Sequence, residues 1–172
     1  MNYKTKLHDI KAFIFDYDGV MSDGNIYTAG EHMIMRSGNV KDGYAIQHAI
    51  KCGYKIAIIS GGKGQSIEAR MKMLGVGDVF LSCKSKLGVY EKYLKDNNLE
   101  KANVLYMGDD IPDYDIMLNC GVATCPKDAA DEVKQLADYI SDKNGGEGCV
   151  RDVIEQVLKL QDTWFNENAK EW

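Results

Sequence analysis

The feature that most constrains the fold is a short apolar run that ends in two acids. Ala12-Phe13-Ile14-Phe15 leads directly into Asp16-Tyr17-Asp18-Gly19. An uninterrupted apolar run is typical of a strand buried inside a parallel sheet, and the glycine allows a sharp turn after it. Open α/β sheets bind ligands at the carboxyl ends of their strands. One carboxylate could therefore attack or bind a metal there while the other carries a proton.

Strand-like and helix-like patterns alternate along the chain. Strands are predicted at 12–16, 55–60, 103–107, 121–124 and 138–141. Helices are predicted near 42–52, 64–74, 86–97, 113–119, 129–137 and 149–161. This alternation predicts an α/β fold, a doubly wound and mainly parallel Rossmann-like sheet with helices on both faces. The length of 172 residues predicts a single core domain over residues 1–160.

Two segments depart from this alternation. Residues 26–35 are typical of two short strands around a turn at Ala29-Gly30-Glu31, which predicts a β-hairpin over about 24–38. Its apolar residues Met33-Ile34-Met35 indicate either a local flap or a surface that binds another subunit. The tail at 161–172 contains two tryptophans and a phenylalanine, so we expect it to pack on its own domain or on a neighbour.

Composition argues against several functional classes. The net charge of −5 does not favour binding to nucleic acid or to a membrane surface. No segment approaches the roughly 18 apolar residues of a membrane span. The five cysteines form no Cys-x-x-Cys pair and the three histidines are scattered, so neither predicts a zinc site. We expect reduced thiols and a cytoplasmic location.

Three further signals lie where predicted strands end or predicted helices begin. Ser60-Gly61-Gly62 offers a hydroxyl and backbone N–H groups, which together can cradle an anion. Lys86 begins a helix and is either an anion ligand or a solvated side chain. Asp109, Asp110 and Asp113 follow an apolar strand, and such closely spaced acids favour a divalent cation. Oxygen ligands without histidine or cysteine predict Mg²⁺.

Together these signals supply what phosphoryl transfer requires: a nucleophile, a proton donor, a cation and positioned hydrogen-bond donors. They resemble the motifs of the haloacid dehalogenase-like phosphatases, in the capless subgroup, over nearly the whole chain. The four matching motifs are Asp16-Tyr17-Asp18-Gly19-Val20, Ser60-Gly61, Lys86, and Gly108-Asp109-Asp110 with Asp113. Further similarity lies in Met21-Ser22-Asp23-Gly24, Val40-Lys41-Asp42-Gly43 and Gly145-Gly146-Glu147-Gly148-Cys149-Val150-Arg151-Asp152.

The resemblance implies how the reaction is divided among these residues. Asp16 would be the nucleophile and form an aspartyl-phosphate. Asp18 would protonate the leaving alcohol and later deprotonate the hydrolytic water. Mg²⁺ would be held by Asp16, by the main-chain carbonyl of Asp18 and by Asp109. Ser60 and Lys86 would hold the phosphoryl oxygens.

The resemblance also implies supporting roles. Asp110 and Asp113 would orient the metal ligands and the lysine. Substrate binding would fall to Gly61 and Gly62 at the phosphate and to Arg70, which in relatives faces the sugar acid and is otherwise a solvated helix residue.

The implied substrate is the phosphate ester of an eight-carbon keto-deoxy sugar acid of lipopolysaccharide biosynthesis. A nine-carbon sialic-type sugar acid is the alternative, although Gly62 replaces the acid that those relatives carry. The hairpin uses the sequence between Asp18 and Asp42, so no cap domain is expected, and the resemblance implies a homotetramer through the hairpin. A phosphoacceptor receiver domain is the competing hypothesis, but its acid pair should be adjacent rather than spaced Asp-x-Asp.

Overall fold

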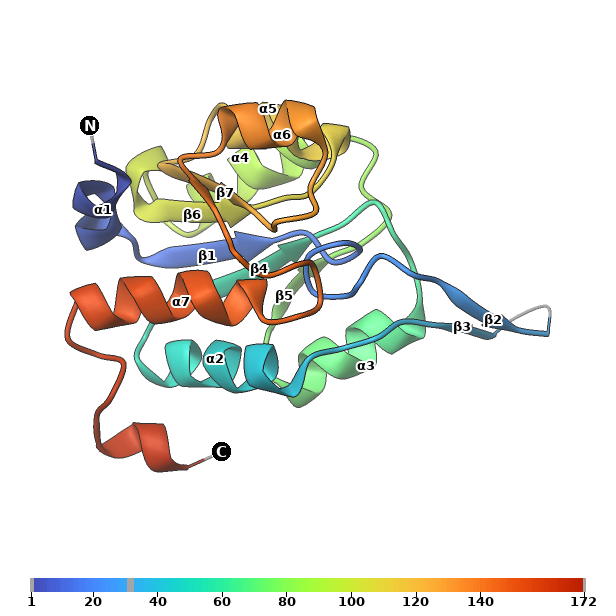
Figure 1. Cartoon of the computed structure of the whole chain (residues 1–172), viewed down its shortest axis with the longest axis horizontal. Helices are drawn as coiled ribbons and strands as arrows, with labels where there is room; N and C mark the ends of the chain where they lie inside the picture. Colours follow the sequence, from blue (N-terminus) through green and yellow to red (C-terminus); the bar gives the residue numbers. More distant parts are fainter. Residues whose placement is uncertain (1, 31–32, 172) are drawn as a thin grey trace.

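The protein is built on a six-stranded parallel sheet with helices on both faces (Figure 1). The computed structural model describes residues 2–30 and 33–171. In spatial order the strands are β5 (Asp78–Phe80), β4 (Lys55–Ile59), β1 (Ala12–Phe15), β6 (Val104–Met107), β7 (Val122–Cys125) and β8 (Tyr139–Ile140). The predicted doubly wound α/β architecture is confirmed.

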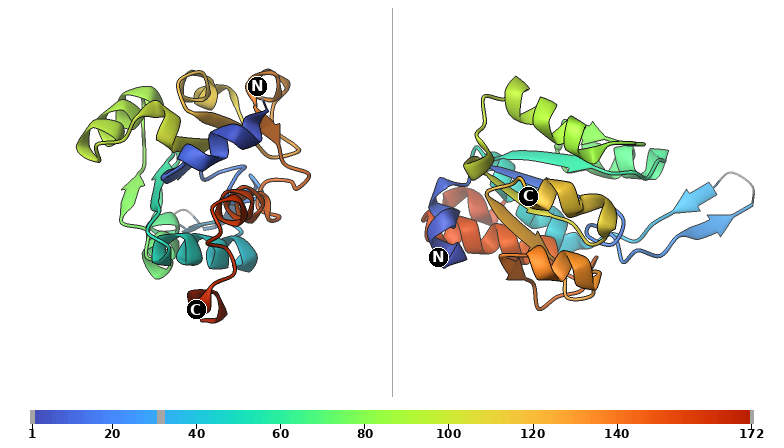
Figure 2. Two further views of the ribbon diagram at one scale, coloured as in Figure 1. Left: turned by 90° about the vertical axis from the view of Figure 1, so that its left-hand side faces the viewer. Right: turned by 90° about the horizontal axis from the view of Figure 1, so that it is seen from above.

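Helices cover the two faces in separate groups. Their bounds are α1 (Tyr3–Lys6), α2 (Val40–Lys51), α3 (Gln65–Met73), α4 (Lys86–Asp96), α5 (Tyr114–Met117), α6 (Asp131–Leu136) and α7 (Cys149–Leu160). Figures 1 and 2 show α2, α3 and α7 on one face and α4, α5 and α6 on the other.

Strand β1 joins the two cores, because alternate side chains of a strand point to opposite faces. Phe13 and Phe15 pack with the apolar residues of α2, α3 and α7. Ala12 and Ile14 pack with those of α4, α5 and α6. All four are fully buried, which explains why the apolar run is uninterrupted.

The order of the strands positions the site. With the hairpin set aside and strands numbered along the chain, the order is 3-2-1-4-5-6, which is the Rossmann order. It reverses at β1, so the connections from β1, β4 and β6 open a crevice at their carboxyl ends. A receiver domain would have the flavodoxin-like order 2-1-3-4-5. The strand order therefore argues against the receiver hypothesis.

The predicted hairpin after the first strand is confirmed. β2 (Tyr27–Ala29) and β3 (Met33–Met35) pair antiparallel, with Tyr27 opposite Met35, and project away from the sheet (Figure 1). The predicted turn at Ala29-Gly30-Glu31 lies partly outside the described residues. No cap domain is present among the described residues.

Three elements differ from the sequence prediction, and the first is the short helix α1, which was not predicted. The sequence pattern does not predict the edge strand β5, because this strand is only three residues long and none of its residues is fully buried. The predicted helix at 113–119 is limited to α5, because a 3₁₀ turn (Ile111–Asp113), with a proline in it, precedes this helix.

The described part of the aromatic tail packs on its own domain. Trp164 makes edge contacts with Tyr44 and His48 of α2, at centroid distances of 6.0 and 5.6 Å. Lys51 donates to the carbonyl of Glu171 at 2.8 Å. Phe165, by contrast, is 82% exposed. Among the described helices, none has the length and apolar character needed to span a bilayer.

Candidate active site

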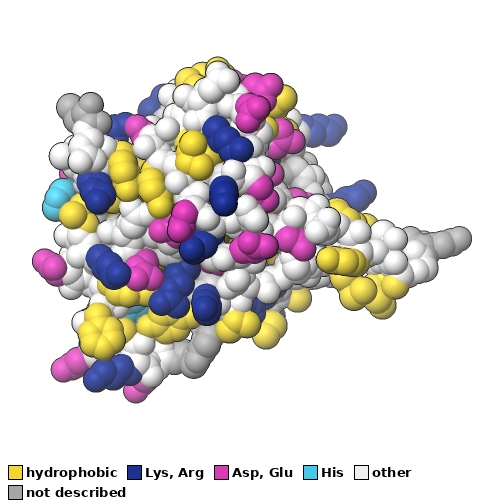
Figure 3. All heavy atoms as spheres, viewed as in Figure 1, with side chains coloured by type: hydrophobic (Ala, Val, Ile, Leu, Met, Phe, Trp, Pro, Cys, Tyr) yellow, Lys and Arg dark blue, Asp and Glu magenta, His cyan; other side chains and the backbone are white. Residues whose placement is uncertain are grey.

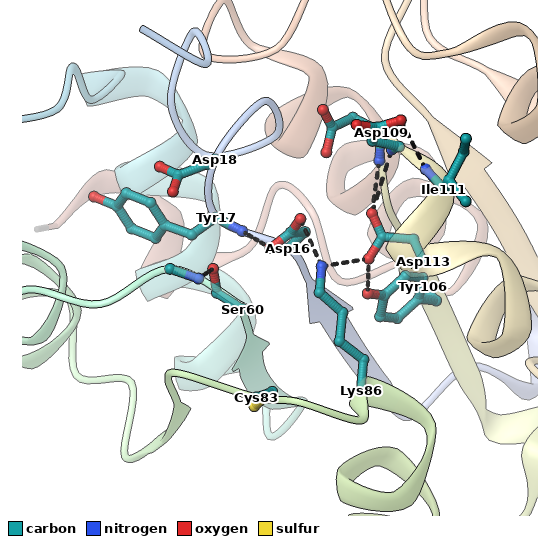
Figure 4. Close-up of polar contacts among 12 residues, drawn as sticks. Asp16, Tyr17, Asp18, Ser60, Cys83, Lys86, Tyr106, Asp109, Ile111 and Asp113 are labelled. Carbon is teal, nitrogen blue, oxygen red and sulfur yellow. Dashed lines mark hydrogen bonds and ion pairs between the residues drawn. The ribbon is translucent and has the colours of Figure 1, made fainter. Parts of the chain in front are cut away.

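A cleft of about 300 Å³ opens at the carboxyl end of the sheet. It is lined by Asp16, Asp18, Gly19, Gly24, Ser60, Gly61, Gly62, Lys86, Asp109, Asp110 and Pro112. Asp16 directly follows β1, Ser60 directly follows β4 and Asp109 is the second residue after β6, so the strand order itself brings them together (Figure 4). Lys86 reaches the cleft from the first turn of α4, which begins after the N-cap Ser85.

Lys86 lies between two carboxylates at the floor of the cleft. Its Nζ is 2.7 Å from Oδ2 of Asp16 and 2.7 Å from Oδ1 of Asp113 (Figure 4). Burial lowers the pKa of Lys86, but the two carboxylates outweigh it and the pKa is raised. The ammonium therefore stays charged next to Asp16, where a phosphoryl group would bring further negative charge.

Asp113 orients Lys86 and is saturated with hydrogen-bond donors. Its side chain is fully buried. Oδ1 also accepts from the hydroxyl of Tyr106 at 2.6 Å, and Oδ2 accepts from the backbone N–H groups of Asp109 and Asp110 at 3.1 and 3.4 Å. These four donors occupy both oxygens, so Asp113 fixes the lysine and the β6 loop rather than contacting a ligand.

Asp109 brings a second carboxylate next to that of Asp16. Carboxylate oxygens of Asp16, Asp109 and Asp113 lie within 4.8 Å of one another. Burial and the charges of Asp16 and Asp113 raise the pKa of Asp109 to about 8. Burial, followed by the charge of Asp113, also raises the pKa of Asp16 against the opposing effect of Lys86. Because carboxylates crowded in this way repel one another, a cation between Asp16 and Asp109 would relieve the repulsion.

The donor set fits Mg²⁺. With Asp113 saturated, the cleft offers the oxygens of Asp16 and Asp109, and it offers neither histidine nor cysteine. Hard oxygen ligands of this kind suit Mg²⁺. Gly19 makes the approach possible, since a Cβ there would lie only 2.0 Å from Oδ2 of Asp109. The glycine that follows the acid pair thus serves the metal site as well as the turn.

The loop after β4 forms the opposite wall. The Oγ of Ser60 accepts from the N–H of Gly62 at 3.1 Å, which holds the turn in shape. Asp18 lies across from it and pairs with Arg36. Sequence analysis missed Arg36, because it directly follows the exposed strand β3 and no motif marks it.

Two predicted residues lie away from the floor of the cleft. Asp110 is exposed at the rim, and its Oδ1 accepts from the N–H of Ile111, so it caps the 3₁₀ turn and does not contact Lys86. Arg70 of α3 is outside the residues that line the cleft and packs next to Gly43 of α2. A substrate contact from Arg70 stays a prediction that would need a neighbouring subunit.

Comparison with known proteins identifies the family of the chain. A model of the haloacid dehalogenase-like hydrolase family matches residues 82–154. The 3-deoxy-D-manno-octulosonate 8-phosphate phosphatase of Salmonella typhi is 34% identical over 157 residues, which cover 91% of this chain and 84% of the relative.

Solved structures give the same result. The crystal structure of the corresponding phosphatase from Yersinia pestis matches with a TM-score of 0.92 at 32% identity, covering 94% of this chain and 88% of the other. The Moraxella catarrhalis enzyme, solved with a magnesium ion, a phosphate ion and the KDO molecule, matches with a TM-score of 0.90 at 31% identity, covering 93% and 92%.

The fold, the acidic cleft at the carboxyl end of the sheet and these matches define a haloacid dehalogenase-like hydrolase. Within that class, the chain belongs to the family of the 3-deoxy-D-manno-octulosonate 8-phosphate phosphatases.

Proposed function

We propose that the protein hydrolyses 3-deoxy-D-manno-octulosonate 8-phosphate to the free sugar acid and inorganic phosphate, a reaction of lipopolysaccharide biosynthesis. The observation that carries this proposal is the convergence of Asp16, Ser60, Lys86 and Asp109 on one small cleft. Relatives that share this fold over most of both chains carry the name of this activity, and one of them was solved with magnesium, phosphate and KDO.

The cleft supports attack by Asp16 on phosphorus. Oδ2 of Asp16 forms an ion pair with Lys86, and Oδ1 of Asp16 accepts a hydrogen bond from the N–H of Tyr17 at 2.6 Å. As one carboxylate oxygen bonds to phosphorus, the bond from phosphorus to the sugar oxygen breaks and Asp18 gives that oxygen its proton. In the second step Asp18 takes a proton from water, the water oxygen bonds to phosphorus, and Asp16 is released.

The remaining groups stabilise charge on the transferred phosphoryl group. Asp16, Asp109 and the main-chain carbonyl of Asp18 would hold Mg²⁺, which would supply positive charge near the phosphoryl oxygens. Lys86 and the Ser60 hydroxyl supply further positive charge and a hydrogen bond in the same cleft.

The test is a panel of phosphate esters assayed with Mg²⁺. It contains the eight-carbon sugar acid phosphate, a nine-carbon sialic-type sugar acid phosphate and simple sugar phosphates. We expect the highest kcat/KM for the eight-carbon ester. Asp16→Asn should abolish phosphate release, and Asp18→Asn should slow it by at least about 100-fold. A preference for the nine-carbon ester would overturn the substrate, and full turnover by Asp16→Asn would overturn the nucleophile.

We also propose that the protein is cytoplasmic. We further propose that it forms a homotetramer in which the subunits pack together through the hairpin. Hydrophobic side chains gather along one edge of the projecting hairpin (Figure 3). Exposed fractions reach 51% for Ile26 and Tyr27 and 57% for Met33, and such an apolar patch favours burial against another surface. A neighbour there would also shield a cleft that lacks a cap. Light scattering at micromolar concentration should give four subunits, and Met33→Glu with Ile34→Glu should give monomers. A wild-type monomer would refute the assembly.

A further inference from the structure

Arg36 is a buried arginine that holds the proposed proton donor. Its side chain is 4% exposed. Nε donates to Oδ1 of Asp18 at 2.6 Å, and Nη2 donates to Oδ2 at 3.2 Å. This two-point contact fixes the plane of the carboxylate as well as its position, which a single hydrogen bond would not do.

The pair lies directly over the loop that follows β4. A Cβ added to Gly62 would be 2.7 Å from Oδ2 of Asp18, 3.3 Å from Nη2 of Arg36 and 3.3 Å from Oγ of Ser60. Oδ2 is therefore the Asp18 oxygen nearest to the turn expected to cradle the phosphate. It is also the oxygen with the longer contact to Arg36, so it is the one more easily given up to a substrate.

Arg36 has no direct route to the substrate. Its remaining nitrogen, Nη1, is buried and has no hydrogen-bond partner among the described residues. A Cβ on Gly64 would lie 3.4 Å from it, so the loop covers this nitrogen. Arg36 is also absent from the lining of the cleft. Asp18 is therefore the contact through which we expect Arg36 to affect the reaction.

Stability alone explains this arrangement poorly. Desolvation offsets much of the attraction in a buried ion pair, and a buried N–H without a partner adds a further cost. Replacement of Arg36 by an apolar side chain of similar length would remove the unpaired N–H, and the Asp18 carboxylate, whose side chain is 30% exposed, would still be in contact with water. The two-point grip on a carboxylate next to the phosphate cradle is the feature that an apolar residue could not reproduce.

We propose that Arg36 is a positioning residue: it grips Oδ1 of Asp18 and leaves Oδ2 facing the cradle as the oxygen that carries the proton. This inference rests on the proposed phosphatase function. Arg36 directly follows β3, so the placement of the proton donor is tied to the base of the hairpin.

The test uses two esters that differ in their need for a proton. The sugar alcohol requires protonation as it leaves, whereas p-nitrophenolate leaves without it. Release of the alcohol is followed in the first turnover, which separates phosphorylation of Asp16 from the later step that uses Asp18 as a base. Arg36→Met should slow the sugar ester by about 100-fold and p-nitrophenyl phosphate by less than about 10-fold. Lys72→Gln, at an exposed lysine of α3, should change neither rate.

Two further variants keep the result interpretable. Arg36→Lys keeps the charge, but its one ammonium nitrogen cannot reproduce the two-point contact, so it should restore only part of the rate with the sugar ester. In an Asp18→Asn background, Arg36→Met should add less than about a 3-fold loss, because residues acting as a unit are not additive. Equal losses on both esters, no loss on the sugar ester, or a full further loss in the Asp18→Asn background would each overturn the proposal. A wild-type enzyme inactive on both esters would instead refute the phosphatase function.

Discussion

Gly19 and Gly53 offer a direct test of the metal site, because they share a backbone conformation and differ in surroundings. Their φ angles are +84° and +89°. Alanine strains this left-handed conformation, so each Gly→Ala change should lower the free energy of unfolding by about 1 kcal/mol. A Cβ on Gly53 meets nothing within 4 Å, whereas on Gly19 it would lie 2.0 Å from Oδ2 and 2.5 Å from Cγ of Asp109.

We expect both variants to lose stability, and we expect only Gly19→Ala to need more Mg²⁺ for activity. In Gly19→Ala the carboxylate of Asp109 must shift, which would displace a proposed Mg²⁺ ligand. Disturbing even an outer-shell partner of a metal typically costs 10–100-fold in affinity or activity, so we expect the half-saturating Mg²⁺ concentration to rise by at least about 10-fold. Urea unfolding and phosphatase activity against Mg²⁺ concentration measure the two effects. Identical Mg²⁺ dependence in both variants would refute this account of Gly19.

Two further predictions concern buried groups around the site. Tyr106→Phe removes one of the donors to Asp113 and should lower the free energy of unfolding by about 1.5–3 kcal/mol, measured by urea denaturation; a change under about 0.5 kcal/mol would contradict the network. Asp42 caps α7 through the N–H of Arg151 at 2.7 Å, and burial raises its pKa from 3.8 to about 6. The folded state therefore binds the Asp42 proton more tightly than the unfolded chain does. This proton makes its full contribution to the free energy of unfolding below about pH 4, and the contribution is lost as the pH rises through about 6. The loss approaches about 3 kcal/mol for this shift. Asp42→Asn should remove that slope from unfolding curves collected between these pH values, and an unchanged slope would show that Asp42 is not its source.

Much of the candidate site could be predicted because its residues directly follow strands of a parallel sheet. In such a sheet, ligands bind at the carboxyl ends of the strands. Once the apolar runs before Asp16, Ser60 and Asp109 are assigned as neighbouring parallel strands, their carboxyl ends must meet at one edge. The short spacing after each run leaves little freedom for the side chains. Lys86 could be included for a similar reason, since a helix start after Ser85 fixes its direction.

Other features depend on contacts between segments that no single-sequence pattern links. Arg36 contacts Asp18 only because the chain leaving the hairpin passes next to the loop that contains Asp18. Asp110 and Asp113 were predicted to act together, yet only Asp113 turns into the core, where Tyr106 and Lys86 meet it. The acids are three residues apart in the 3₁₀ region, and the sequence alone does not tell which one faces inward.

Whether Asp16 itself accepts the phosphoryl group is tested most directly by trapping the covalent enzyme. Enzyme turning over the sugar acid phosphate with Mg²⁺ is quenched in acid and reduced with borohydride, which converts an acyl phosphate of aspartate to homoserine. Peptide mass spectrometry then locates the modified residue. We predict homoserine at position 16 in wild type and none in Asp16→Asn. Modification at another aspartate, or active enzyme with no modification at all, would contradict the account.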